Sequence, residues 1–349
     1  MDIREIAKRA RVSTATVSRA INRVPSVNPL LAKRVWSVID ELGYYPNTQA
    51  RALVSGRSRI FGLIVSEITN PFFPEIVQVF ETIAVQHQYE ILLTSTGNDP
   101  KRMESSVRRM IERRVEGVAI MTFGMEEVLL EDLKLRKVPL VFVDVGPHRP
   151  HVSNIRIDYL HGIRQAVQHL AALRHERIAF ITGPLRLKSA VSRKQAFLRS
   201  MEEIGLEAHP ALIVEGDHTM EGGMAAFAQL LSSRPTAVLC SNDMTAIGVM
   251  RKCHEEGIII PTDLSVVGFD DIRMAQFMLP PLTTVQMSQA ELGRLSFNAL
   301  LADVGREVPA PEGTEFVLKT NLVLRESTAL VSSSAKRGKP SRAGDGTSS

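Results

Sequence analysis

The chain has 349 residues, of which 44% are hydrophobic and 23% charged, and its formal net charge is +4. This length exceeds one typical domain, so two or three folded units are expected. No stretch approaches the roughly 20 apolar residues that cross a bilayer, and the N-terminus lacks the features of a signal peptide, which together indicate a cytoplasmic protein without a membrane partner.

The charge is unevenly distributed along the chain. Residues 1–59 contain 11 Lys and Arg against four Asp and Glu, a net charge of +7. Residues 336–349 carry +3, which leaves −6 for the residues between. A basic head on an acidic body predicts that the head alone meets a polyanion, with an affinity that falls steeply with salt.

The two cysteines, Cys240 and Cys253, lack the short spacing of metal ligands. A disulfide framework and a zinc site are therefore poorly supported, and both thiols are expected to be reduced and buried. The sequence predicts neither a metal nor a cofactor.

Two short amphipathic helices open the chain. Apolar residues recur at helical spacing over residues 3–10, and Ser13 is placed to cap a second helix whose dry face carries Val17, Ala20 and Ile21. Two helices joined this tightly form a helix-turn-helix, whose second helix enters the major groove of DNA.

A third helix is predicted from an Asn28 cap and Pro29 to Gly43, and it supplies a core that two short helices cannot build. Residues 46–57 are also compatible with a helix. This helix would be marginal on its own, because it is short and lacks a wide apolar stripe.

The order V-S-x-x-T-V-S-R-x-x-N at residues 12–22, followed by G-Y-x-P-N and A-R-x-L at residues 43–53, resembles the lactose/galactose repressor (LacI/GalR) family of bacterial transcription regulators. The resemblance covers nearly the whole chain. It implies an N-terminal all-α helix-turn-helix headpiece and an α/β periplasmic-binding-protein-like type I effector domain, built from two doubly wound parallel-sheet subdomains. It also implies a hinge helix at residues 46–59 that orders when two subunits bind DNA together, with Leu53 wedged into the minor groove.

The candidate DNA-contacting residues are small polar or apolar side chains and one arginine. They are Ser13, Thr14, Ala15, Thr16, Ser18, Arg19, Asn22, Asn28, Asn47, Ala50 and Leu53. Thr14 and Ala15 would face base edges, while Arg19 would bond a guanine or a phosphate. The expected partner is double-stranded DNA with a palindromic site, read by a homodimer. The alternatives are a helical hairpin with a solvated face and a flexible linker whose Leu53 packs on the next domain.

From residue 60 onward, apolar runs alternate with helical patterns, which predicts parallel sheets covered by helices in two similar blocks. The predicted strands are residues 60–65, 90–94, 117–121, 139–144, 178–182, 211–214, 236–240 and 264–269, and the predicted helices are residues 74–87, 101–114, 160–173, 193–204 and 245–256.

The expected units are a helix-turn-helix domain (1–45), a hinge (46–59), a first effector subdomain (60–158 with 288–320), a second (159–287 with 321–330) and a disordered basic tail (331–349). The tail cannot bury a core, and it lacks a leucine heptad. A dimer is therefore expected, not a tetramer.

Ligands of open α/β sheets bind beyond the carboxyl ends of the strands. The candidate effector-binding residues lie there, in N-P-F-F, S-x-x-S-R, S-N-D and V-G-F-D-D motifs that match the family: Phe72, Phe73, Ser189, Arg193, Asn242 and Asp270. A ring for stacking, a guanidinium and groups for hydroxyls are the pattern expected of a site for a sugar or sugar derivative.

Several residues near these motifs have a structural alternative. The phenylalanines could simply be core residues, and Asp243 and Asp271 are interpreted as helix N-caps. Arg193 is predicted to open a helix. Lys188 could reach an acidic sugar or be solvated.

The predicted function is a transcriptional regulator, in particular a repressor, whose affinity for its operator is controlled by a small molecule through a population shift. A sugar-binding protein without a DNA role would not need the basic head. An enzyme would need a reactive constellation, and the sequence contains no phosphate-binding glycine loop, nucleophile elbow or metal-spaced histidine pair. His169 and His175 are interpreted as solvated or capping.

Overall fold

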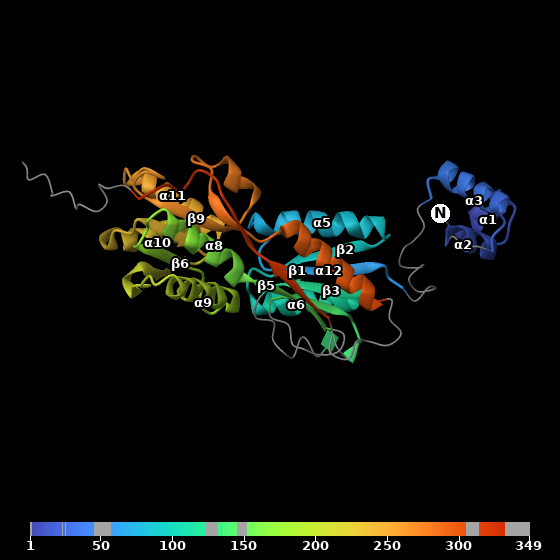
Figure 1. Cartoon of the computed structure of the whole chain (residues 1–349). Coiled ribbons are helices and arrows are strands. Elements are labelled where there is room, and N and C mark those ends of the chain that lie inside the picture. Colours follow the sequence, from blue (N-terminus) through green and yellow to red (C-terminus); the bar gives the residue numbers. More distant parts are fainter. Residues whose placement is uncertain are drawn as a thin grey trace, which may run out of the picture.

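The computed structural model describes residues 2–22, 24, 26–44, 57–122, 132–133, 135–144, 152–304 and 314–331. These form a helical headpiece followed by two α/β subdomains, which lie side by side (Figure 1). Most of the predicted hinge, with its candidates Asn47, Ala50 and Leu53, and the tail after Val331 lie outside the described residues.

The headpiece consists of α1 (Ile3–Ala10), α2 (Thr14–Ile21) and α3 (Pro29–Leu42). Both predicted N-caps are confirmed, because Ser13 Oγ accepts the amide hydrogen of Thr16 at 3.0 Å and Asn28 Oδ1 accepts that of Leu30 at 2.9 Å. Gly43 ends α3 with a φ of +56°, a conformation that glycine adopts without strain. The three helices enclose a small core of their own.

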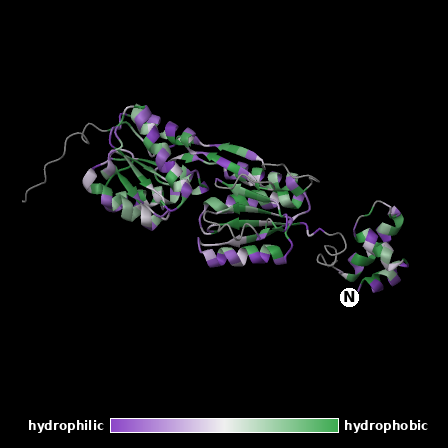
Figure 2. Ribbon diagram, turned by 90° about the horizontal axis from the view of Figure 1, so that it is seen from below, coloured by the Kyte–Doolittle hydropathy of each residue, from purple (hydrophilic) through white to green (hydrophobic). Residues whose placement is uncertain are grey.

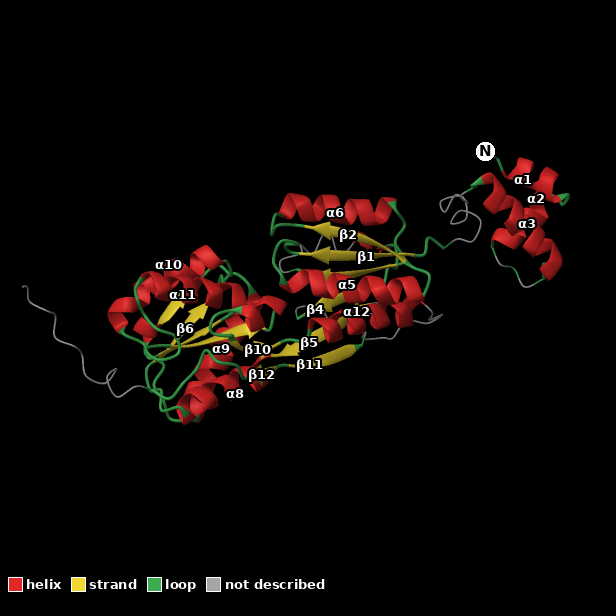
Figure 3. Cartoon of the chain, turned by 90° about the horizontal axis from the view of Figure 1, so that it is seen from above, coloured by secondary structure: helices red, strands yellow, loops and turns green. Residues whose placement is uncertain are grey.

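The first subdomain contains a parallel sheet of order β11-β5-β4-β3-β1-β2. Its strands are β1 (Ile60–Val65), β2 (Glu90–Ser95), β3 (Gly117–Met121), β4 (Leu140–Val143), β5 (Val152–Asp158) and β11 (Glu315–Lys319). Helices α5 (Phe72–Gln86) and α12 (Gln289–Val304) cover one face, and α6 (Pro100–Glu112) covers the other (Figure 3). The alternation of β1 fits this arrangement, because Leu63 packs with the α5 and α12 side and Ile64 with the α6 side.

The second subdomain contains a sheet of order β12-β10-β9-β8-β6-β7, in which only the pairing of β12 with β10 is antiparallel among the described strands. Its strands are β6 (Ile178–Thr182), β7 (Ile213–Glu215), β8 (Ala237–Cys240), β9 (Ser265–Asp270), β10 (Thr283–Gln286) and β12 (Asn321–Val323). Its α-helices are α8 (Tyr159–Ala172), α9 (Lys188–Glu203), α10 (Met220–Leu230) and α11 (Asp243–Glu255), and its short 3-10 helices are η1 (Pro210–Leu212), η2 (Leu231–Ser233) and η3 (Arg273–Phe277). Hydrophobic residues concentrate in the strands of both sheets, while the helices turn hydrophilic faces outward (Figure 2).

Within the described residues, the chain passes between the subdomains after β5, after β10 and after β11. Thr320 fastens two of these crossovers together. Its hydroxyl donates to the carbonyl oxygen of Asp158 at 2.7 Å and accepts the amide hydrogen of Gly162 at 3.0 Å. The ends of both sheets therefore face each other across three short connections.

Some predicted elements differ in the structure. The strand predicted at residues 211–214 begins two residues later, at Ile213. Pro210 begins η1 instead, and His209 Nδ1 accepts the amide hydrogen of Ala211. Strand β5 was not predicted, since its buried Ser153 and Asn154 interrupt the apolar run. The elements β10, β11, β12, α10 and α12 were not predicted either.

His169 and His175 contact residues 328–329, near the last residue that the structure describes, so their interpretation as solvated or capping residues is wrong. His169 Nε2 lies 2.9 Å from Thr328 Oγ1. His175 contacts Thr236 Oγ1 at 3.1 Å and the carbonyl oxygen of Ala329 at 3.0 Å.

The thiols of Cys240 and Cys253 are free and buried, as expected. In the part of the chain that the structure describes, no cluster of three or more His, Cys, Asp or Glu could hold a metal ion. The same residues include no helix with the length and apolarity that a membrane crossing requires.

Candidate functional site

A cavity of about 130 Å³ lies between the two subdomains, at the carboxyl ends of the strands of both sheets. Its volume is below the roughly 300 Å³ at which drug-sized pockets begin, which favours a small ligand. All the candidate effector-binding residues line it: Phe72, Phe73, Ser189, Arg193, Asn242 and Asp270.

Arg193 is buried in the wall of this cavity. The prediction that it begins a helix is wrong, because it lies in the second turn of α9. Its Nη1 donates to the carbonyl oxygen of Ser241, and its Nη2 lies 3.7 Å from Asp270 Oδ1. The guanidinium carbon lies 5.1 Å from the ring centroid of Tyr159 and 4.3 Å from that of Phe269, within the range of cation–π attraction. Arg193 Nε and Asp270 Oδ1 make no hydrogen bond among the described residues, so a polar ligand would satisfy both.

The buried carboxyl group of Asp270 is expected to make the stability of the protein depend on pH. Burial raises the pKa of its carboxyl group to about 7, although the charge of Arg193 favours the ionised form. An unfolded aspartate titrates near 4, so between about pH 4 and pH 7 the native state holds a proton that the unfolded state has released. The contribution of Asp270 to the free energy of unfolding is therefore expected to fall as pH rises through this range, by on the order of a few kcal/mol.

Urea titrations of the wild type and of Asp270→Asn, at about pH 5 and about pH 8, measure this contribution. The asparagine variant should lose that part of the pH dependence. If both proteins show the same slope, another group carries the proton.

Asn242 is the N-cap of α11. Its Oδ1 accepts the amide hydrogen of Thr245 at 2.9 Å, and its Nδ2 donates to the carbonyl oxygen of His218 at 3.1 Å. The side chain therefore fixes two parts of the cavity wall relative to each other.

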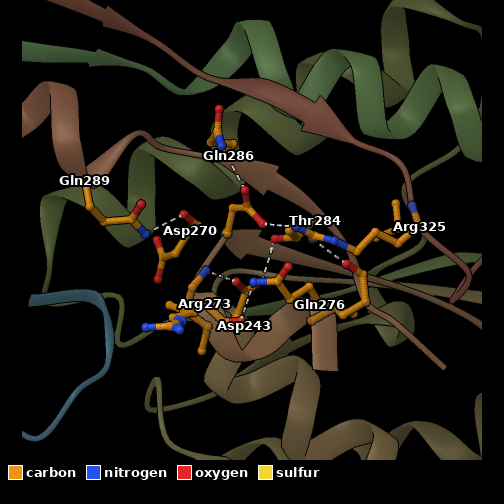
Figure 4. Close-up of polar contacts among 12 residues, drawn as sticks. Asp243, Asp270, Arg273, Gln276, Thr284, Gln286, Gln289 and Arg325 are labelled. Atoms are coloured by element: carbon orange, nitrogen blue, oxygen red, sulfur yellow. Dashed lines mark hydrogen bonds and ion pairs between the residues drawn. The ribbon is translucent and has the colours of Figure 1, made fainter. Parts of the chain in front are cut away.

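Asp243 is not the cap that the sequence predicted, but the first helical residue of α11, and it is fully buried. Its carboxyl group accepts the amide hydrogen of Ile272 at 2.8 Å. It also accepts the hydroxyl hydrogen of Thr284 (Figure 4). Burial raises the pKa of Asp243 well above its ordinary value, and the nearby Asp270 adds to this shift. Asp243 thus joins α11 to β10 and to the loop after β9.

Asp271 does not cap a helix either, contrary to prediction. Its Oδ1 accepts a hydrogen from Arg325 Nη2 at 2.7 Å, and its Oδ2 accepts one from Gln286 Nε2 at 2.8 Å. Next to it, Gln289 Nε2 donates to the carbonyl oxygen of Asp270 at 2.8 Å (Figure 4). These contacts tie the cavity wall at the end of β9 to β10, to the start of α12 and to the segment after β12.

Two further buried polar atoms belong to side chains of the cavity wall, Ser189 Oγ and His218 Nε2, and neither makes a hydrogen bond among the described residues. The His218 ring lies against Gly183, where a Cβ would come within 1.9 Å of Nε2. Burial, together with the charge of Arg193, lowers the pKa of His218 to about 3. The imidazole is therefore neutral at pH 7, and its Nε2 donates or accepts according to its tautomer.

Phe72 and Phe73 begin α5 and are each less than a tenth exposed. Their rings pack edge to face with centroids 5.3 Å apart. They belong to the core and also line the cavity, so their interpretation as core residues does not exclude a role in effector binding. Lys188 is exposed and does not line the cavity, whereas Arg186 does.

Tyr159 and His218 are among the cavity-lining residues that the sequence analysis did not name as candidates. The Tyr159 hydroxyl donates to Asp144 Oδ2 at 2.7 Å, and burial raises the pKa of both groups. Tyr159 follows the end of β5, and His218 follows the end of β7. A search of strand ends would have found them if β5 had been predicted and β7 had been placed at Ile213–Glu215.

On the headpiece, α2 buries Val17, Ala20 and Ile21 and turns its other face outward. Five candidate DNA-contacting residues on or beside this face are exposed: Ser13, Thr14, Ala15, Arg19 and Asn22. Asn28, at the start of α3, is also exposed, while Thr16 and Ser18 are partly buried. Apart from the methyl group of Ala15, the exposed side chains can donate or accept hydrogen bonds, which suits a face that reads DNA.

A helix-turn-helix headpiece joined to a two-subdomain core with a cavity between the subdomains defines a class of ligand-responsive DNA-binding proteins. Comparison with known proteins agrees. Residues 2–47 match the family model of bacterial regulatory proteins of the lacI family, and residues 167–328 match that of a periplasmic binding protein-like domain.

The ribose operon repressor of Haemophilus influenzae is 33% identical over 93% of this chain and 98% of its own length. The HTH-type transcriptional repressor PurR of Aliivibrio salmonicida is 32% identical over 86% of this chain and 91% of its own. The chain therefore belongs to the lacI family of bacterial regulatory proteins, and the predicted family, fold class and class of function are confirmed. These relatives are transcriptional repressors and not enzymes.

Solved structures show the same architecture. The lac repressor dimer bound to operator and the anti-inducer ONPF has a TM-score of 0.82 at 28% identity, over 94% of this chain and 99% of that one. A lacI-family regulator from Enterococcus faecium with bound ribose has a TM-score of 0.71 at 28% identity, over 78% of this chain and all of that one.

Proposed function

We propose that the chain is a dimeric transcriptional repressor that binds a palindromic operator through α2 and is controlled by a sugar-like effector in the cavity between its subdomains. The observation that carries the effector assignment is a set of buried polar atoms without partners among the described residues. Four of them belong to cavity-lining side chains: Ser189 Oγ, Arg193 Nε, His218 Nε2 and Asp270 Oδ1.

These four atoms include donors and acceptors, as a ligand with several hydroxyl groups requires. The opposite wall carries the apolar rings of Phe72 and Phe73, which can pack on the face of a sugar ring. The small cavity favours a ligand of monosaccharide size. The ribose and the cellobiose bound by two related regulators of known structure support this ligand class.

A dimer is supported by exposed apolar side chains on η3 and the segment after it. Phe277 is 71% exposed and Leu279 is 91% exposed, which is unusual for a patch that faces only water. Two subunits would present two copies of α2 to the two halves of a palindrome. A regulator of this kind acts on the chromosome, and hence in the bacterial cytoplasm.

The effector assignment is tested by a thermal-shift screen of the full chain against sugars, sugar acids and sugar phosphates. A ligand that binds only the native state raises the melting temperature. The same ligand should not stabilise Asp270→Ala. If no sugar stabilises the wild type, or if the variant responds equally, the cavity is not a sugar site.

The DNA assignment is tested by enrichment of sequences from a pool of random duplexes. The wild type should enrich a palindrome. Arg19→Ala should weaken binding to that palindrome by about 1 to 3 kcal/mol per subunit, because an exposed arginine on the reading face is lost. The control Arg108→Ala removes the same charge from an exposed ion pair on α6 and should bind as the wild type does. Failure to enrich any sequence would exclude specific DNA binding.

A further inference from the structure

At the base of the first subdomain, one carboxylate holds the segment through which the chain enters β1. Glu116, directly before β3, accepts hydrogens from the Arg57 guanidinium at 2.9 Å and 3.3 Å. Its other oxygen accepts the amide hydrogen of Arg59 at 2.8 Å. The Tyr89 hydroxyl donates to Glu116 at 2.9 Å and accepts a hydrogen from Arg57 at 2.9 Å. We refer to Arg57, Arg59, Tyr89 and Glu116 as the anchor.

The anchor rests on the core of the first subdomain through Tyr89. The Tyr89 ring stacks on Phe61 of β1 with centroids 4.2 Å apart and an interplanar angle of 14°. It also meets Phe297 of α12 edge to face at 6.3 Å, and the Arg59 guanidinium carbon lies 5.5 Å from its centroid. The hydroxyl of a buried ring therefore has a fixed position, and so do the charges bonded to it.

The surroundings of the Glu116 carboxylate stabilise its charged form. The Glu116 side chain is only 13% exposed, while that of Arg57 is 47% exposed. Burial alone would raise the pKa of Glu116, but hydrogen bonds from Arg59, Arg57 and Tyr89 outweigh it and lower the pKa. A mostly buried carboxylate that accepts several hydrogen bonds contributes more to the free energy of folding than an exposed ion pair does.

Nothing in the effector cavity requires this arrangement, because none of the four residues lines it. The anchor instead lies where the described part of the core begins, on the chain that comes from the headpiece. We infer that Glu116 and Tyr89 are positioning residues for DNA binding, which fix the place and direction in which each subunit's chain leaves the core toward its headpiece. This inference rests on the proposed dimeric repressor.

Two headpieces on one palindrome bind cooperatively only if their attachment points have the right separation and direction. Loss of the anchor should therefore weaken binding to a palindrome and spare binding to a single half-site. We expect Glu116→Gln to weaken palindrome binding by about fivefold to tenfold, because only the fraction of molecules with a docked segment would bind both half-sites. Tyr89→Phe keeps the ring, removes its hydroxyl and should show a smaller change in the same direction.

The experiment compares two duplexes by fluorescence anisotropy: the palindrome that the wild type enriches, and the same duplex with one half scrambled. The matched control is Glu104→Gln, which removes one negative charge from an exposed pair with Arg108 on α6. As a readout independent of DNA, trypsin should cleave after Arg57 and Arg59 faster in Glu116→Gln than in Glu104→Gln.

The outcomes separate the two proposals. If the wild type enriches no palindrome, the proposed function fails before the anchor is tested. If the wild type binds the palindrome and both anchor variants keep its ratio of palindrome to half-site affinity, the anchor inference is overturned. Equal weakening on both duplexes also contradicts it, because that result indicates a general loss of folding. If Glu116→Gln does not fold, Tyr89→Phe alone decides between these results.

Discussion

Replacement of Arg193 by methionine is expected to abolish control by the effector while the protein still folds and binds DNA. The variant loses the buried Nε that faces the proposed ligand and the contacts of the guanidinium with the carbonyl of Ser241 and with Asp270. A charge-assisted hydrogen bond contributes about 1.5 to 3 kcal/mol, so loss of the bond that Nε would donate should lower the affinity for the effector by about 10-fold to 150-fold. The fold should survive, because without the cation the pKa of Asp270 rises further and the carboxyl group stays protonated.

Isothermal titration with the sugar identified by thermal shift measures this loss. The matched control is Arg199→Met, an exposed arginine farther along α9 that pairs with Glu203 at 3.1 Å. It should bind the effector as the wild type does. If Arg193→Met retained effector affinity within about threefold, the buried donors of the cavity would not be the effector site.

Replacement of Gly248 by alanine is expected to be strongly destabilising, although alanine is the better helix former. A Cβ at Gly248 would lie 2.0 Å from the carbonyl oxygen of Met220, and one at Gly223 would lie 2.3 Å from that of Thr245. These glycines let α10 and α11 approach backbone to backbone. The added atom forces the two helices apart, at a cost of about 2 to 4 kcal/mol that exceeds the gain in helix propensity of about 1 kcal/mol.

Urea unfolding of Gly248→Ala measures this cost. Gly205→Ala is a useful comparison, because a Cβ there meets no atom within 4 Å and only its φ of +71° is unfavourable. That variant should lose about 1 kcal/mol. Equal stability of Gly248→Ala and the wild type would mean that α10 and α11 have room to separate.

Several features were predictable from the sequence because they depend on neighbouring residues. The caps at Ser13 and Asn28 and the end of α3 at Gly43 follow from local hydrogen bonding and backbone conformation. The strands β1, β3 and β6 are the ranges predicted, since each is an uninterrupted apolar run. The family motifs also pointed to six side chains that the structure brings to one cavity.

Other features depend on residues far apart in the chain, and there the local patterns failed. Asp243 and Asp271 look like caps in the sequence, but their partners Thr284 and Arg325 come from distant segments. The antiparallel edge strand β12 is too short to have a distinctive pattern. The anchor had no sequence signal, because Arg57 and Glu116 are 59 residues apart.

The sequence by itself determined the headpiece, the alternation of strands and helices, and the family of the protein, because these depend on local periodicity and on short motifs. Only the tertiary structure decided which polar side chains are buried without a partner, and which ones meet at the cavity and at the anchor. The physical reason is that burial and hydrogen bonding depend on the packing of elements that the three crossovers between the sheets bring together.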